Sequence, residues 1–282
     1  MRKSLIHLIF LAGLSGTTGA HAFVVDGNLS DWGVQQNAGA AGWIPTANSG
    51  IQYTVEDQHS SYLNPGYGGQ AYDAEALYAA FALDTDNSYK LFIALATGHN
   101  PNTLDKPGAN SFGAGDFAID FGKDGSFDLG INLKHVIASN GTQESFGVLG
   151  GVYMNPTWAL GLWDSNGNYA PANPDSANPT HLTAGTYIGM ANLAYTSVGQ
   201  TGYGDWAADT HYFYELSIDM NLLLAAGWNG VDPFDIHWTE NCANDSILVD
   251  PPSPTHLPEP GTLALLPLGL AGLLLRRRKS AE

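Results

Sequence analysis

Cysteine is almost absent from the 282-residue sequence, which has Cys242 alone. One cysteine cannot form an intramolecular disulfide, so a hydrophobic core has to stabilise the fold. Seven Trp, thirteen Tyr and eleven Phe supply enough apolar surface for that core. We therefore expect Cys242 to be a small buried residue, with an intermolecular disulfide as the alternative.

Basic residues are also scarce, and six of the ten Lys and Arg lie in the terminal segments 2–3 and 276–279. Residues 23–257 contain four Lys against 25 Asp and Glu, a net charge of −21. A field of this sign repels nucleic acid, which we exclude as a partner, and favours bound divalent cations. The alternative is that the acidic residues only keep the protein soluble.

The sequence motifs of common enzymes are missing as well. There is no His-Glu-x-x-His, no Gly-x-Ser-x-Gly, and no phosphate- or dinucleotide-binding glycine loop in the required context. The histidines are scattered without metal-ligand spacing, which argues against a zinc or copper centre. We predict a protein that is not an enzyme. A glycoside hydrolase is the least favoured alternative, because its two carboxylates need no fixed sequence spacing.

The N-terminus has the pattern of a secretory signal peptide. Basic residues at 2–3 precede an apolar run over 5–14 and an A-x-A cleavage site formed by Ala20 and Ala22. We predict a signal peptide over residues 1–22 and export through the Sec translocon.

The C-terminus has a second targeting pattern. Residues 250–257 form a Pro-rich linker, and residues 258–282 contain a short motif, an apolar run over 262–275 and a basic end. The apolar run is shorter than the roughly 17 to 25 residues that a stable spanning helix needs. We expect a transient membrane anchor with its basic end on the cytoplasmic side. The residues that define this pattern are Pro258, Glu259, Pro260, Arg276, Arg277 and Arg278.

This arrangement resembles the PEP-CTERM sorting signal of bacteria that make extracellular polysaccharide. The resemblance covers residues 257–279 and implies recognition and cleavage by an exosortase, a membrane protease. It further implies transient anchoring in the inner membrane, then delivery to the cell surface or the extracellular matrix, with exopolysaccharide as a partner. The alternative is an ordinary tail anchor in which Pro-Glu-Pro is only a spacer.

Between these segments, short β-rich runs alternate with turns rich in Gly, Asp and Asn. Two pairs of runs, each joined by a short turn, predict β-hairpins over residues 75–97 and 117–133. One helix is expected over 220–226, capped by Asp219. Further strands are expected over 145–153, 186–195, 211–218, 234–239 and 247–250. The pattern predicts an all-β protein, an antiparallel β-sandwich of jelly-roll or immunoglobulin-like type, as one domain over residues 23–249. No repeat of blade length supports the alternative, a β-propeller.

Three segments of this domain carry a second resemblance. Residues 25–32 (Val-Asp-Gly-Asn-Leu-Ser-Asp-Trp), 115–120 and 214–218 are similar to strands of the carbohydrate-binding module family 9-like and DOMON-like sandwiches. The resemblance implies a jelly-roll-like fold that can carry structural calcium and bind sugars or, in other branches, haem. Residues 238–245 also resemble a segment that precedes the sorting signal in other PEP-CTERM proteins. We expect them to form a turn that closes the domain.

Candidate binding residues lie in the turns and in two long loop-like stretches, 33–70 and 163–183, where binding function often sits. Tryptophans in or beside loop-like sequence are the candidates for glycan contact, whereas Trp238 is expected in the core. Asp-rich turns are the candidates for calcium, which prefers oxygen ligands; their alternative role is simply to form the turn. The glycan candidates are Trp43, Trp158, Trp163 and Trp206, and the metal candidates are Asp84, Asp86, Asp120, Asp124 and Asp128.

These observations predict an exported, non-catalytic surface or matrix protein that is associated with exopolysaccharide. A calcium-dependent carbohydrate-binding module is the alternative, and a glycan-active hydrolase is the least favoured.

Overall fold

The computed structural model describes residues 23–46, 50–133 and 146–251. The predicted signal peptide, the sorting motif and most of the Pro-rich linker lie outside these ranges. The described part has eleven strands, one α-helix and three short 3-10 helices. None of the helices in this part is long and apolar enough to cross a membrane. The 3-10 helices are η1 (Gly39–Trp43), η2 (Gly69–Tyr72) and η3 (Pro107–Ala109).

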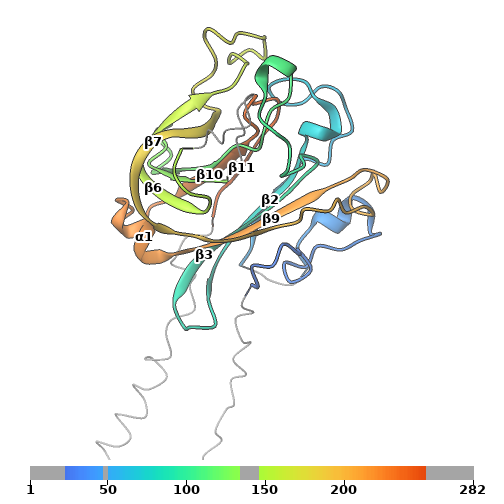
Figure 1. Ribbon diagram of the computed structural model, residues 1–282. Helices are drawn as coiled ribbons and strands as arrows, with labels where there is room; N and C mark the ends of the chain where they lie inside the picture. Colours follow the sequence, from blue (N-terminus) through green and yellow to red (C-terminus); the bar gives the residue numbers. More distant parts are fainter. Residues whose placement is uncertain (1–22, 47–49, 134–145, 252–282) are drawn as a thin grey trace, which may run out of the picture.

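The strands form two antiparallel sheets that face each other (Figure 1). The first sheet has the order β1 (Gln52–Val55), β2 (Ala74–Leu83), β3 (Tyr89–Thr97), β9 (Tyr212–Asp219) and β8 (Asn192–Tyr195). The second has the order β11 (Ser246–Val249), β10 (Phe234–Thr239), β4 (Phe117–Phe121), β5 (Leu129–Ile131), β6 (Gly151–Leu160) and β7 (Pro179–Met190). The prediction of an all-β, antiparallel fold is confirmed.

A hydrophobic core fills the space between the sheets. Side chains alternate between the two faces of a strand, so every second residue of the central strands points inward. Leu77, Ile93 and Leu216 of the first sheet lie in one cluster with Ile119 and Ile236 of the second. All five are fully buried, as is the predicted core residue Trp238.

The outer face of the first sheet carries a second core, because the N-terminal segment 23–46 covers it. Phe23 stacks on Trp32 with ring centroids 4.1 Å apart and contacts Phe92 of β3 at 5.3 Å. Tyr78 of β2 belongs to the same cluster. A sheet that is buried on both faces reads as nearly continuous apolar sequence, which explains the composition of β2 and β3.

Glu215 of β9 ties the N-terminal segment to the sheet. Its Oε1 accepts a hydrogen bond from Trp32 Nε1 at 2.8 Å. Its Oε2 accepts bonds at 2.6 to 3.1 Å from the backbone N–H groups of Asp26, Gly27 and Asn28. Burial raises the pKa of Glu215 to about 7, although these donors oppose the shift. Segments 25–32 and 214–218 therefore meet at one carboxyl group.

Several predicted elements are confirmed. The two hairpins are present as the antiparallel pairs β2–β3 and β4–β5. The helix α1 (Met220–Ala225) begins at Asp219, whose side chain accepts a hydrogen bond from the Asn221 N–H at 2.8 Å. The strands expected over 211–218, 234–239 and 247–250 correspond to β9, β10 and β11 within one residue.

Other predictions of strands and loops are wrong in position. The strand expected over 145–153 begins only at Gly151. The strand expected over 186–195 is two strands in different sheets, because the chain leaves β7 for β8 at Ala191. The loop-like stretch 163–183 includes the start of β7, where Pro179 is tolerated because β7 is an edge strand.

Candidate functional site: an aromatic pocket

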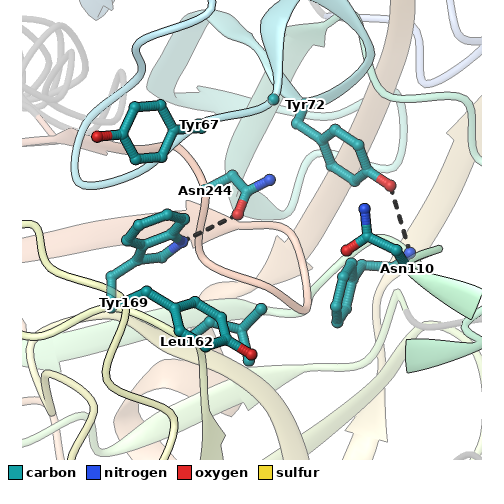
Figure 2. A pocket seen from close by; sticks show the side chains of 9 residues that line it. Tyr67, Tyr72, Asn110, Leu162, Tyr169 and Asn244 are labelled. Carbon is teal, nitrogen blue, oxygen red and sulfur yellow. Dashed lines mark hydrogen bonds between the residues drawn. The ribbon is translucent and has the colours of Figure 1, made fainter. Parts of the chain in front are cut away.

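Loops at one end of the sandwich enclose a pocket of about 390 Å³ (Figure 2). These loops precede β2, precede β4, follow β6 and join β10 to β11. The lining residues are mostly aromatic or carry an amide: Tyr67, Gly68, Tyr72, Asn110, Phe112, Leu162, Trp163, Tyr169 and Asn244. No Asp, Glu, Lys or Arg is among these described lining residues, so the wall of the pocket is neutral.

Trp163 is held in place from several sides. Its Nε1 donates a hydrogen bond to Asn244 Oδ1 at 2.9 Å. The ring centroids of Tyr67 and Tyr169 lie 5.2 and 5.9 Å from the indole. The indole also lies against Gly66, where a Cβ atom would fall 2.1 Å from Trp163 Cε2. The position of the ring is therefore fixed by the protein itself.

Tyr72 and Phe112 line a further part of the pocket. The Phe112 N–H donates to the Tyr72 hydroxyl oxygen at 3.4 Å, and His99 Nε2 lies 2.9 Å from the Phe112 carbonyl oxygen. Burial lowers the pKa of His99 to about 4. The ring is neutral at pH 7, and Nε2 donates to the carbonyl oxygen.

The loop over residues 240–245, between β10 and β11, places Asn244 in the pocket wall. All six of its residues are at most 9 % exposed, although most are polar. The Leu162 N–H donates to the Cys242 carbonyl oxygen at 2.9 Å, which joins this loop to the one after β6. The turn predicted over 238–245 is present only from residue 240, because residues 238 and 239 end β10. Cys242 is fully buried, as expected, and burial raises the pKa of its thiol.

The pocket is suited to a neutral ligand rich in hydroxyl groups. Tyr67 and Tyr169 are 47 % and 66 % exposed, so their rings can contact the apolar face of a ligand. Asn244 uses its amide oxygen on Trp163 and keeps its amide nitrogen as a donor, and Asn110 lies across the pocket from Tyr169 (Figure 2). Aromatic walls with a few polar groups are typical of small-molecule sites.

A second cavity of about 380 Å³ adjoins the first at Tyr72. Its wall is again neutral, and the Asn100 amide donates to the Tyr212 hydroxyl at 3.1 Å within it. A ligand built from several units therefore has room on both sides of Tyr72. The other residues that line this cavity are Gln70, Ala71, Gly98, Thr103 and Thr210.

The four tryptophans predicted to contact glycan lie in different places. Trp163 lines the pocket but is only 8 % exposed, which corrects the expectation of an exposed ring, because Tyr67, Tyr169 and Gly66 pack around the indole. Trp43 is fully buried, which corrects the expectation of an exposed ring, because its Gly-rich segment folds into η1 and packs the indole into the second core. Trp158 is half-buried in β6, and Trp206 is 46 % exposed. The structure does not bring these rings together.

The Asp-rich turns use their carboxylates within the protein. Asp84 forms an ion pair with Lys90, and Asp86 Oδ2 lies 3.4 Å from the same ammonium group. In the other turn, backbone N–H groups of the same hairpin donate at 2.7 to 3.1 Å to Asp120, Asp124 and Asp128. Both turns are thus stabilised by their own aspartates, and calcium binding at either one stays a prediction.

Sequence reasoning identifies one of the nine described lining residues, Trp163. Tyr67 and Tyr72 belong to the loop before β2, where Tyr72 is the last residue of η2, and Tyr169 belongs to the loop after β6. Only the fold brings these two loops together. The sequence feature that could have indicated the pocket is the density of tyrosine in the Gly-rich segment 62–72.

Comparison of the chain with protein-family models, with curated proteins and with solved structures finds no match.

Proposed function

We propose that the protein is an exported, non-catalytic surface or matrix protein, delivered by a PEP-CTERM sorting signal, that contacts a neutral glycan through the aromatic pocket. In this proposal the two-sheet domain is a jelly-roll-like relative of the carbohydrate-binding sandwiches. The observation that carries the proposal is the neutral pocket of about 390 Å³ with the fixed Trp163 ring in its wall.

The chemistry of the pocket favours a sugar over other ligands. Aromatic faces contact the C–H surfaces of a pyranose, and amides bond to its hydroxyl groups. No described lining residue is basic, and the mature chain is strongly acidic. Both facts disfavour an acidic polysaccharide. The described wall also offers no pair of carboxylates for glycoside hydrolysis.

The test is binding of neutral and acidic oligosaccharides to the full-length protein, by glycan array and then by calorimetric titration. We expect saturable binding of a neutral oligosaccharide. Replacing Tyr169, which is 66 % exposed, with alanine should weaken it by about tenfold, the loss of roughly 1.4 kcal/mol of contact energy at an aromatic anchor.

Trp206→Ala is the matched control, because Trp206 is an exposed ring outside the pocket lining. It should bind the oligosaccharide as the wild type does. Failure of the wild type to bind any neutral glycan would refute the proposal. Loss of oligosaccharide binding in Trp206→Ala alone would indicate a glycan site at Trp206, outside the pocket.

A further inference from the structure

Two exposed tyrosine rings, Tyr62 and Tyr67, contact each other beside the aromatic pocket. Their ring centroids are 4.9 Å apart, and the ring planes are inclined by 58°. This separation is close to the shortest at which unbonded aromatic rings pack, about 4.5 Å. Tyr62 is 69 % exposed and Tyr67 is 47 % exposed. Both phenols are therefore accessible to a dissolved reagent while they remain in contact with each other.

The backbone holds these two tyrosines opposite each other. They form an antiparallel β-bridge, which is flanked by backbone hydrogen bonds of 2.8 and 3.2 Å between the neighbouring residues. In a pair of this kind the two residues do not bond to each other, and their side chains lie closer together than in a hydrogen-bonded pair. The Gly66 N–H donates to the Asn244 carbonyl oxygen at 2.8 Å, which fixes the turn to the body of the domain. The contact between the rings is thus a consequence of the fold.

The exposure of both rings distinguishes this pair from other neighbouring tyrosines in the described part of the chain. In three further pairs one ring is buried, so a dissolved reagent reaches only its partner. The buried rings are Tyr78 beside Tyr53, Tyr153 beside Tyr187, and Tyr214 beside Tyr195. Oxidation of both members of a pair is therefore favoured at Tyr62 and Tyr67.

We propose that Tyr62 and Tyr67 form a modification site, at which oxidation joins the two rings in a dityrosine cross-link. Each phenol loses one electron and one proton and becomes a phenoxyl radical. The two radicals combine through a carbon–carbon bond between ring positions ortho to the oxygens. The hydrogen on each of these carbons then moves to the oxygen, which restores both phenols. Hydrogen peroxide, acting through a haem peroxidase, accepts the two electrons and two protons and is reduced to two molecules of water.

This cross-link would brace the wall of the pocket covalently. A disulfide cannot do so, because Cys242 is the only cysteine of the chain and is fully buried. The Tyr67 ring centroid lies 5.2 Å from that of Trp163, so a bond to Tyr62 restrains a ring that packs against the indole. The inference does not depend on glycan binding, since the reaction needs only the two phenols and the oxidant.

The test is treatment of the dilute full-length protein with hydrogen peroxide and a haem peroxidase. Intact mass, dityrosine fluorescence and peptide mapping identify the product. We expect a fluorescent monomer that has lost two hydrogen atoms, with the new bond between Tyr62 and Tyr67. Tyr62→Phe and Tyr67→Phe keep the ring but remove the hydroxyl that the coupling needs, and each should abolish this product.

Tyr187→Phe is the matched control, because Tyr187 is exposed but its neighbour Tyr153 is buried. This variant should give the cross-linked monomer in the same yield as the wild type. Absence of dityrosine from the wild-type monomer, or bonds formed only between chains or at other residues, would overturn the proposal.

Oxidation of the wild type in urea separates the effect of the fold from that of sequence proximity. We expect the yield of the bond between Tyr62 and Tyr67 to fall in the unfolded chain, because the rings then meet only by chance. An equal yield from folded and unfolded protein would overturn the assignment of the site to the fold.

Discussion

Replacing Gly66 with alanine tests how rigidly the pocket holds Trp163. The new Cβ atom would lie 2.1 Å from Cε2, 2.4 Å from Nε1 and 2.6 Å from Cζ2 of the indole. Carbon atoms in contact need about 3.5 Å, so the ring has to retreat by more than ~1 Å. That movement stretches the 2.9 Å hydrogen bond from Trp163 to Asn244 past the length at which it stabilises the structure.

The expected loss of stability has two parts, the overpacking around the new methyl group and the broken hydrogen bond of Trp163. Forcing an extra methyl group into a packed site costs about 1 to 3 kcal/mol, and a buried donor without its partner costs about 1 to 3 kcal/mol. Gly66 does not have a positive φ angle, so backbone strain adds nothing. We expect Gly66→Ala to lower the free energy of unfolding by about 2 to 6 kcal/mol and to weaken binding in the pocket.

Urea unfolding followed by tryptophan fluorescence measures this effect. Gly108→Ala is the matched control, because a Cβ atom there has no neighbour within 4 Å, and its free energy of unfolding should stay within about 0.5 kcal/mol of the wild type. If Gly66→Ala is as stable as Gly108→Ala, the Trp163 ring is free to move and the pocket is not preformed.

Two further predictions concern pH and processing. Burial lowers the folded pKa of His99 from 6.5 to about 4, so the unfolded state takes up the proton first and stability is lost as pH falls from 6.5 toward 4. Between pH 7 and pH 5, the free energy of unfolding of the wild type, measured with urea, should fall by about 2 kcal/mol more than that of His99→Gln. Equal decreases in the two proteins would contradict a buried neutral ring. In a host with an exosortase, replacing Pro258 and Glu259 with alanine should leave the C-terminal tail on the protein, as read by intact mass, whereas the wild type should lose it; a retained tail in both would favour an ordinary tail anchor.

The sequence predicts the hairpins well because the composition of each turn indicates a chain reversal without any information from distant residues. The segment 84–88 contains Asp, Asn and Ser between two apolar runs, and that composition alone favours a reversal of the chain. The cap at Asp219 is a local signal of the same kind. Both features depend on residues within a few positions of each other, so no knowledge of the tertiary fold is needed.

Trp43 shows where local signals fail. Its Gly-rich neighbourhood is typical of an exposed loop. A Cβ atom at Gly42 would lie 2.4 Å from the Gln35 carbonyl oxygen, so glycine lets the segment fold tightly on itself, and the Trp43 indole is buried. The burial of Asp73 and Asp245 could not be predicted, for a different reason. Asp73 and Asp245 are 172 positions apart in sequence, as their numbers show, and only the placement of β2 beside the β10–β11 loop makes them neighbours. Sequence alone treats each as one more acid on a soluble protein.

The loop over residues 240–245 connects the aromatic pocket to buried acidic residues. Asn244 holds Trp163 in the pocket wall, while Glu240 and Asp245 of the same loop are fully buried. A buried loop with so many polar groups is costly to form unless its partners are satisfied. The bond from Trp163 satisfies the Asn244 amide oxygen, and the backbone N–H groups of Asn64, Ala74 and Ser246 donate to Asp245. Because these bonds hold the loop at both ends, it presents Asn244 and Trp163 to a ligand in one fixed arrangement.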